Sequence, residues 1–278
     1  MSAGITSIVL LAAVLHAGWN ALLRAGDDRL WSMSVMCLAV ALACAALAPF
    51  VPVPAAASWI YALLSALLHV GYNLFLVRTY RHGELGQAYP ISRGSSPLLV
   101  SLGAAAFAQE WPGAMALAGI LLVSAGILSL AFHGRRIGRD TLLYALGTGC
   151  FIGAYSVTDG IGARLSGTPV GYTVWMCLLW GLMAPAVYLA LRGRRGFVRS
   201  GCEIGTAAAG GLVSLLAYGI VVFAMSRGAM GPVSALRETS VVFAALIGRF
   251  FLGERLSAAR LLACVVVAAG AVLIGSGG

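Results

Sequence analysis

The sequence predicts an all-α membrane protein in which ten transmembrane helices form two inverted five-helix repeats around a central cavity. Three observations lead to this fold class. Hydrophobic residues make up 60% of the chain and charged residues only 10%, and the mean hydropathy is +0.95, which is far from a soluble domain. The apolar residues fall into stretches of membrane-spanning length. One stretch also occurs twice, about half the chain apart.

A helix that crosses a bilayer needs about 20 predominantly apolar residues. Ten stretches have this character, and the connections between them are short, so no soluble domain fits between helices. Prolines at 49–54 separate the second helix from the third, and basic segments at 133–140 and 192–203 separate later pairs. The predicted helices are 4–23, 31–51, 59–77, 86–107, 113–132, 141–162, 170–191, 206–225, 232–252 and 260–276.

The fourth and ninth predicted helices contain the repeated stretch, Ser92-Arg93-Gly94-Ser95-Ser96 and Leu236-Arg237-Glu238-Thr239-Ser240. At a constant offset of 144 residues the match runs without a gap through Arg93/Arg237, Ser96/Ser240, Leu102/Leu246, Phe107/Phe251, Glu110/Glu254, Ala125/Ala269 and Gly126/Gly270. This indicates a duplication, with repeats at 1–136 and 137–278. A five-helix unit ends on the opposite face of the membrane, so we expect the second repeat to be inverted.

Each copy of the stretch places one arginine, Arg93 or Arg237, inside a hydrophobic helix. An arginine at a helix centre costs at least about 2.5 kcal/mol to insert, so each guanidinium needs water or a partner. One interpretation is a substrate carboxylate, phosphate or phosphonate, which suits the planar fork of donors. The other is an internal carboxylate, which would make each arginine a strut between helices. Pro90 and Pro97 flank Arg93 and are expected to break the fourth helix.

Two acids also lie deep in apolar stretches, Glu238 in the ninth predicted helix and Asp159 in the sixth. Neighbouring positions on a helix point about 100° apart, so Glu238 and Arg237 are not expected to form a simple ion pair. Glu238 could instead contact Arg93 across the cavity, bind a substrate ammonium group, or take up a proton. Both Glu238 and Asp159 are candidates for proton coupling, because a buried carboxyl group can exist in either protonation state.

A second pattern, H-x-G-aromatic-N, occurs in the first and third predicted helices as His16-Ala17-Gly18-Trp19-Asn20 and His69-Val70-Gly71-Tyr72-Asn73. Histidine and asparagine four positions apart share one helix face. They form either a substrate-binding cavity wall or an interhelical polar clamp without a ligand. Tyr155, Ser156 and Tyr218 are the counterparts in the second half, so we expect an asymmetric pocket. Trp175 and Trp180 either line the cavity or face lipid. No further Cys or acidic ligand accompanies the two histidines, so no metal site is predicted.

All eighteen basic residues are arginine, and nine residues are acidic. Without lysine the chain has no Walker A loop and no Schiff-base amine, so neither an ATP-driven motor nor a cofactor is predicted. The arginines lie in short gaps between apolar stretches, which is typical of membrane orientation and not of nucleic-acid binding. Fourteen arginines belong to one face, against Arg164 and Arg227 on the other. The positive-inside rule then predicts both chain termini outside the cytoplasm.

The sequence resembles the EamA-like carriers of the drug/metabolite transporter superfamily. Two five-helix units each close with a Gly-rich helix after a glutamate, as in Ala108-Gln109-Glu110 and Leu252-Gly253-Glu254-Arg255-Leu256. The resemblance implies a central cavity lined by the first, third and fourth helices of each repeat, and transport of small metabolites by alternating access. It also implies cytoplasmic termini, the opposite of the orientation that the arginines indicate.

Together these features predict a multi-pass secondary transporter of the cytoplasmic (inner) membrane, and not an enzyme. Its predicted partners are the lipid bilayer and a small polar metabolite, whose anionic group is held by Arg93 and Arg237. An amino acid or analogue is favoured, with organic phosphates or phosphonates as the alternative. A membrane-embedded enzyme or a non-transporting subunit is less favoured, because the chain lacks H-E-x-x-H, G-x-S-x-G and paired acids within a span.

Overall fold

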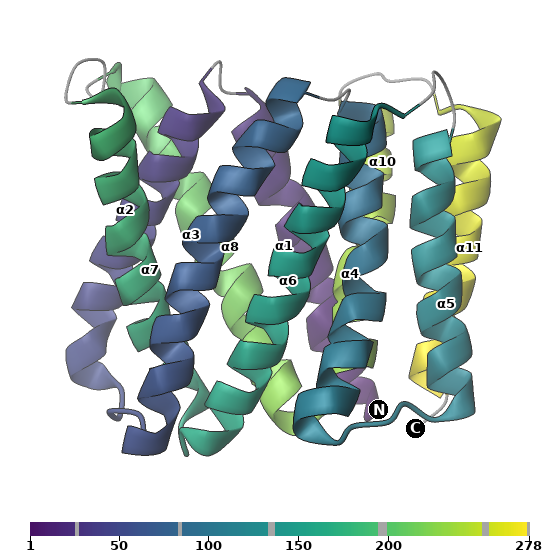
Figure 1. The fold of residues 1–278 in the computed structure, drawn as a ribbon, viewed down its shortest axis with the longest axis horizontal. Coiled ribbons are helices and arrows are strands. Elements are labelled where there is room, and N and C mark those ends of the chain that lie inside the picture. The colour runs from purple at the N-terminus through teal and green to yellow at the C-terminus, as the bar shows by residue number, and fades with distance from the viewer. Residues whose placement is uncertain (26–27, 83–84, 133–136, 194–198, 252–255, 277–278) are drawn as a thin grey trace.

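The computed structural model of the chain describes residues 1–25, 28–82, 85–132, 137–193, 199–251 and 256–276. These residues form helices and contain no β-strand, which confirms the predicted all-α fold (Figure 1). The α-helices are α1 (Ala3–Ala25), α2 (Arg29–Leu47), α3 (Trp59–His82), α4 (Leu85–Ala108), α5 (Ala114–Ser129), α6 (Arg139–Leu165), α7 (Pro169–Arg192), α8 (Gly201–Arg227), α9 (Met230–Glu238), α10 (Ser240–Phe251) and α11 (Ala258–Ser276). Short 3₁₀ helices lie at Ala48–Phe50, Ala56–Ser58 and Leu130–Phe132.

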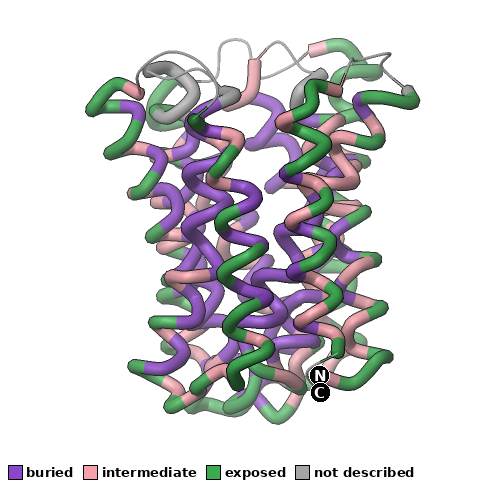
Figure 2. Tube along the Cα trace, turned by 90° about the vertical axis from the view of Figure 1, so that its right-hand side faces the viewer, coloured by how far each residue is buried: buried purple, intermediate pink, exposed green. Residues whose placement is uncertain are grey.

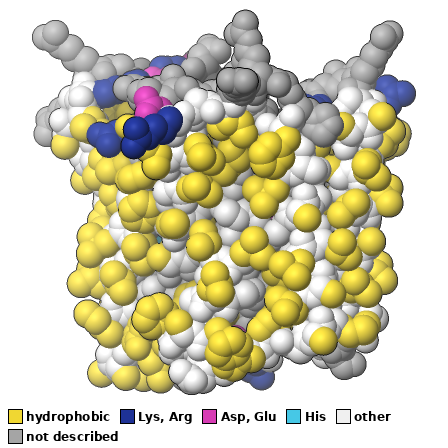
Figure 3. Space-filling view, turned by 45° about the vertical axis from the view of Figure 1, so that its right-hand side comes forward, with side chains coloured by type: hydrophobic (Ala, Val, Ile, Leu, Met, Phe, Trp, Pro, Cys, Tyr) yellow, Lys and Arg dark blue, Asp and Glu magenta, His cyan; other side chains and the backbone are white. Residues whose placement is uncertain are grey.

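Nine of the described segments are long and apolar enough to cross a membrane. The helix α4 has 24 residues, which is also long enough, but it carries four serines and Arg93 among its apolar residues. Hydrophobic side chains cover the flank of the molecule, whereas the charged side chains in this view lie at its two ends (Figure 3). The chain is therefore a multi-pass membrane protein.

Helices of the two halves pack on one another in a reciprocal pattern. The helix α3 packs on α6, and its counterpart α8 packs on α1. In the same way α4 packs on α6, while α9 and α10 pack on α1. Counterpart helices also meet directly, α2 against α7 and α5 against α11. Both ends of the described chain lie at the same face of the bundle (Figure 1). An inverted five-plus-five repeat predicts this arrangement.

Buried residues concentrate toward the interior of the bundle (Figure 2). All nine residues of α9 are buried, and α4 is buried without interruption from Pro90 to Pro97. These two segments contain the repeated arginines, so both arginines lie inside the protein and not toward lipid.

Small residues allow the last helices of the two halves to cross closely. A Cβ atom on Gly119 of α5 would lie 2.7 Å from the carbonyl oxygen of Gly270 in α11. A Cβ atom on Gly270 would lie 2.7 Å from the carbonyl oxygen of Gly119. Because no side chain fits at either position, the two glycines set the distance between these helices.

The helix break that the sequence predicts near Arg93 is absent, since α4 continues through both prolines. Pro97 cannot donate to the Arg93 carbonyl, and the Ser96 hydroxyl donates to that carbonyl instead, at 3.1 Å. The break lies in the second copy, at Thr239 between α9 and α10. There the hydroxyl and the N–H of Thr239 both donate to the Leu236 carbonyl, at 2.6 and 3.1 Å, which tightens the turn.

Candidate functional site

Arg93 and Arg237 meet at the carboxylate of Glu238, in the interior of the bundle. Arg237 donates to Oε1 through Nε at 3.1 Å and through Nη2 at 3.0 Å. Nη1 of Arg93 lies 3.5 Å from both carboxylate oxygens. The Ser96 hydroxyl donates to Oε1 at 3.3 Å, and Nη1 of Arg237 lies 3.5 Å from the Ser156 hydroxyl. Each arginine is 3% exposed and Glu238 is fully buried, so the cluster is removed from water.

The contact between Arg237 and Glu238 was not expected from their adjacent positions. Glu238 is the last residue of α9, and the long arginine side chain bends across the angle between the two positions. The contact between Glu238 and Arg93 across the two repeats is one of the predicted alternatives, and the structure confirms it. Since two guanidinium groups share one carboxylate, the cluster has a formal net charge of one positive unit.

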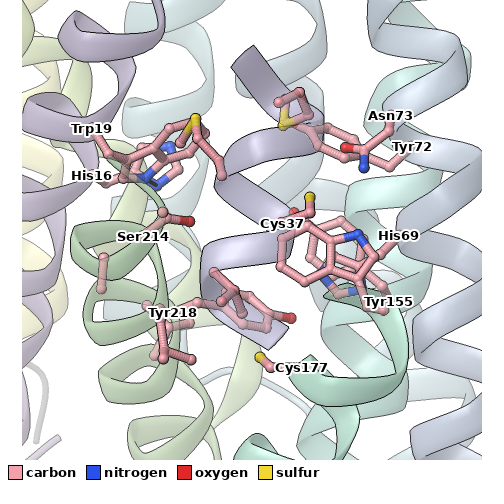
Figure 4. Close-up of a pocket in the computed structure, with 18 of the residues that line it drawn as sticks. His16, Trp19, Cys37, His69, Tyr72, Asn73, Tyr155, Cys177, Ser214 and Tyr218 are labelled. Atoms are coloured by element: carbon pink, nitrogen blue, oxygen red, sulfur yellow. Dashed lines mark hydrogen bonds between the residues drawn. The ribbon is translucent and has the colours of Figure 1, made fainter. Parts of the chain in front are cut away.

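Both arginines line a cavity of about 760 Å³ of free space, which includes its open side. His16, Trp19 and Ser214 lie on one side of this cavity, and His69, Tyr72 and Tyr155 lie on the other (Figure 4). Nine of the eleven predicted binding residues line it: Arg93, Arg237, His16, Trp19, His69, Tyr72, Asn73, Tyr155 and Tyr218. Glu238 lies behind the arginines. Asn20 does not line it and donates to the His16 carbonyl at 2.8 Å.

Three side chains of the cavity wall hold buried polar atoms that have no hydrogen-bond partner among the described residues. They are His16 through Nε2, Asn73 through both amide atoms, and Trp180 through Nε1. A buried polar group without a partner costs about 1–3 kcal/mol, so such groups are rare. These three come from α1, α3 and α7 and surround one cavity. A polar ligand would satisfy them together.

Aromatic rings form the wall where α3, α6, α7 and α8 meet. The imidazole of His69 stacks on Tyr155, with ring centroids 4.0 Å apart and an interplanar angle of 24°. The rings of Trp180 and Tyr218 lie 5.0 and 5.3 Å from the same imidazole. This cluster offers flat surfaces that suit the apolar part of a small ligand or a cationic group.

The second predicted acid, Asp159, is fully buried behind this aromatic wall and does not line the cavity. The Tyr172 hydroxyl donates to its Oδ1 at 2.9 Å, and the Tyr218 hydroxyl donates to its Oδ2. Nearby, Nδ1 of His69 lies 3.2 Å from the Ser65 hydroxyl and 2.9 Å from the Ser65 carbonyl. Asp159 thus contacts the cavity wall through a tyrosine, whereas Glu238 contacts it through two arginines.

The hydrogen bonds described for the two histidines stay within their own helices. Nε1 of Trp19 donates to Nδ1 of His16 at 3.2 Å within α1, and His69 contacts Ser65 within α3. The structure therefore shows no clamp between α1 and α3 among these described side chains. The glycines of the pattern also differ: a Cβ atom on Gly71 would collide with Phe151 of α6, whereas Gly18 has open space.

Comparison with known proteins agrees with this architecture. Residues 140–276 match the model of the EamA-like transporter family. The second half of the chain therefore belongs to this family. A solved structure described only as "Crystal structure of protein" aligns with a TM-score of 0.74 and 20% identity, over 97% of this chain and 94% of that chain. At that identity the likeness shows the shared fold alone. No curated protein sequence matches.

The EamA-like family consists of membrane transporters, so this chain is a transporter of the drug/metabolite type. In this transporter α2 and α7 also line the cavity, beyond the helices that the resemblance implied. Met36 and Cys37 come from α2, and Cys177 and Trp180 from α7. Methionine and cysteine give no sequence signal for such a role, because both are common packing residues. Trp175 does not line the cavity.

A polar connection joins α6, α8 and α9 to the segment after α4, on the face that holds both chain ends. Glu110, which follows α4, accepts the N–H of Met230 at the start of α9, at 2.9 Å. Arg164 of α6 pairs with Glu110 and donates to the carbonyls of Met225 and Gly228, at 2.8–3.0 Å. We name this connection the terminal clasp. Its counterpart by the 144-residue offset, Glu254 in the 252–256 motif, lies outside the described residues.

The described residues contain no group of three or more His, Cys, Asp or Glu side chains that could hold a metal ion.

Proposed function

We propose that this protein is a secondary transporter that moves a small carboxylate-bearing metabolite, an amino acid or analogue, across the cytoplasmic membrane by alternating access. Arg93 and Arg237 hold the anionic group in this proposal. The central support is that both guanidinium groups line one cavity while sharing a single carboxylate. If the arginines served only as struts between helices, we would expect one carboxylate to balance the charge of each arginine. Here one carboxylate serves both.

The excess of one positive charge favours a substrate that contributes one negative charge at this point. A carboxylate carries one, whereas a phosphate or phosphonate carries up to two at neutral pH. The contact distances also indicate which arginine has donor capacity for the substrate, because Arg93 reaches Glu238 only at 3.5 Å and Arg237 at 3.0 Å. Organic phosphates and phosphonates remain the alternative, since they also suit guanidinium donors.

The remaining wall suits the other groups of an amino acid. Nε2 of His16 and the amide of Asn73 are unpartnered among the described residues and can bond polar substituents. The rings of Tyr155, Trp180 and Tyr218 provide an apolar surface for a side chain. A cavity with an anion site and an aromatic wall matches a ligand that is polar at one end and apolar at the other.

Alternating access is supported by a difference between the two faces. On the face with the chain ends, the terminal clasp joins α6, α8 and α9 to the segment after α4. Toward the other face, a second hollow lies between α1, α2 and α8, beside Arg199 and Glu203. Met36 lines both this hollow and the central cavity. We propose that substrate passes at Met36 in this state and that the clasp opens in the opposite state.

The orientation proposed for the membrane follows the arginines. Arg139, Arg192 and Arg249 are exposed on the face opposite the chain ends, whereas Arg164 and Arg227 lie on the face of the chain ends. Cytoplasmic loops carry the excess of basic residues, so we propose extracytoplasmic chain ends. Labelling of a cysteine added at either terminus with a membrane-impermeant reagent in intact cells tests this orientation.

A thermal-shift screen of purified protein tests the proposed substrate class. The panel contains L-amino acids, their decarboxylated amines, and organic phosphates. We expect amino acids to raise the melting temperature and the amines, which lack the carboxylate, to leave it unchanged. Loss of charge-assisted hydrogen bonds worth about 1.5–3 kcal/mol should weaken binding by about 10- to 100-fold in Arg93→Ala.

The matched control is Arg139→Ala, which removes an exposed arginine at the start of α6 and should bind as the wild type does. Uptake of the stabilising compound into proteoliposomes then separates a carrier from a sensor. A ligand that stabilises the wild type, Arg93→Ala and Arg237→Ala equally would refute the role of the arginines. Stabilisation by phosphates alone would favour the alternative substrate class.

A further inference from the structure

The two acids buried among the transmembrane helices have different partners. Glu238 contacts two guanidinium groups, at 3.0 and 3.5 Å. Asp159 has no ion pair among the described residues, and its described hydrogen bonds come from the neutral hydroxyl groups of Tyr172 and Tyr218. Two arginines stabilise the ionised form of Glu238, but hydroxyl groups alone do not balance the charge of Asp159. Asp159 is therefore the buried acid that is suited to binding a proton.

The groups around Asp159 are compatible with both protonation states. Tyr172 and Cys177 face it from α7, Tyr218 from α8, and Tyr155 from its own helix. His69 of α3 belongs to the same cluster, because its imidazole stacks on Tyr155 and lies 5.3 Å from the Tyr218 ring. A hydroxyl group can turn from donor to acceptor when the carboxyl gains a proton. A guanidinium group cannot, because it only donates.

Tyr218 provides a connection between Asp159 and the cavity. It lines the cavity, and its hydroxyl donates to Oδ2 of Asp159, which does not line the cavity. A hydronium ion in the cavity can give a proton to the Tyr218 oxygen and become water, while the original hydroxyl proton of Tyr218 passes to Oδ2 of Asp159. The O–H bond that breaks is replaced by the one that forms, so the phenol stays neutral and the carboxyl gains one proton.

We propose that Asp159 is the proton-coupling site of this transporter and that Tyr218 carries protons between it and the cavity. The coupling rests on the proposed transport function, but the proton site itself does not. Glu238 then has a structural and charge-balancing role. Tyr218 and His69 also line the substrate cavity, so proton binding behind them changes the wall that the substrate contacts.

Infrared difference spectroscopy of the purified full-length protein tests the proton site without any substrate. Spectra in acidic and alkaline buffers are compared for the wild type, Asp159→Asn and Asp140→Asn. Asp140 is a matched control, because it lies on the same helix but is exposed. We expect a protonated-carboxyl C=O band that titrates in the wild type, persists in Asp140→Asn and is absent from Asp159→Asn.

Wild-type protein labelled with carbon-13 aspartate provides a second measurement that does not depend on folding of the variant. The label should shift the titrating band, because the band belongs to an aspartate. Absence of such a band at every pH would overturn the proposal. A band that responds to Na⁺ at constant pH would also overturn it, since Asp159 would then bind a metal cation in place of a proton.

Proteoliposomes loaded with buffer and supplied with a mixture of L-amino acids test the coupling. We expect an inward proton gradient to drive accumulation by the wild type. Asp159→Asn should retain exchange of labelled amino acid across the membrane and lose accumulation, and Tyr218→Phe should slow accumulation. Accumulation by Asp159→Asn equal to that of the wild type would overturn the coupling. If no amino acid is moved by the wild type, the proposed transport function fails, while the infrared result still decides the proton site.

Discussion

The two copies of the repeated stretch place their arginines in different settings. Arg93 lies in an unbroken helix and reaches Glu238 at 3.5 Å, with the Tyr89 ring 5.4 Å from its guanidinium carbon. Arg237 lies beside a helix break and holds Glu238 through two hydrogen bonds of 3.0 and 3.1 Å. The difference indicates a division of roles, in which Arg237 secures the carboxylate and Arg93 keeps donor capacity for a ligand.

The surrounding helices differ in the same way. The helix α4 tolerates two internal prolines because Ser96 donates to the carbonyl that Pro97 leaves open. The segment of the second copy breaks at Thr239, which leaves α9 as a nine-residue helix. Glu110 of the terminal clasp bonds the start of α9, and the arginine cluster lies at its end. This short helix therefore connects the clasp to the cavity, whereas α4 spans the bundle.

The largest effect is expected from Glu238→Gln, which removes the carboxylate that both arginines share. Two buried guanidinium groups are then without a counter-charge, and breaking a buried ion pair in this way costs about 3–5 kcal/mol. We expect a large fall in melting temperature in detergent. Glu203→Gln, which changes an exposed glutamate of α8, is the control. Equal melting temperatures for the two variants would mean that the cluster does not stabilise the fold.

A smaller difference should separate Arg237→Ala from Arg93→Ala. Without Arg237 the carboxylate keeps the 3.5 Å contact with Arg93 and the Ser96 hydroxyl at 3.3 Å, whereas without Arg93 it keeps both short hydrogen bonds from Arg237. Hydrogen bonds to charged groups contribute about 1.5–3 kcal/mol. We therefore expect the free energy of unfolding of Arg237→Ala to be lower than that of Arg93→Ala by an amount of this order, and its melting temperature to be lower as well. The division of roles would be wrong if Arg93→Ala were the less stable variant in the same thermal-denaturation assay.

Arg164→Gln should open the terminal clasp without changing the arginine cluster. Arg164 is partly exposed, so its ion pair with Glu110 and its bonds to two carbonyls should together contribute about 1–2 kcal/mol. Cys177 of the cavity wall should then react faster with a maleimide, measured by peptide mass spectrometry. Arg227→Gln, at the end of α8 near the same face, is the control. Unchanged labelling of Cys177 would show that the clasp does not limit access.

The smallest effect is expected from Thr239→Val, which keeps the shape of the side chain and removes its hydroxyl. The lost bond to the Leu236 carbonyl should cost about 1 kcal/mol. Because the backbone N–H still reaches that carbonyl, we expect the break to remain and ligand binding to change little. Ser96→Ala is the comparable change in α4, because it removes the hydroxyl that donates to the Arg93 carbonyl. A greater loss of ligand binding in Thr239→Val than in Arg93→Ala would show that the break itself forms the site.

Part of the site could be predicted from the sequence because its residues are unusual in a membrane helix. Arg93, Arg237 and Glu238 are costly in lipid and repeat at a fixed offset, so they indicated an interior cluster. Asn20 and Asn73 occupy equivalent places in one pattern, but only Asn73 faces the cavity, since Asn20 bonds its own helix. Met36 and Cys37 gave no signal, because apolar residues look alike whether they face lipid, a neighbour or a cavity.

The sequence by itself determined the bilayer as solvent and the positions of the membrane-length helices, since these depend on the length and apolar character of the stretches. The two-copy organisation stays a prediction from the internal match. Only the tertiary structure decided how charges pair. The three-way contact at Glu238, the isolation of Asp159 behind Tyr218 and the clasp at Glu110 each join residues from different helices. Such contacts depend on how helices rotate and cross, and a local sequence pattern does not contain that information.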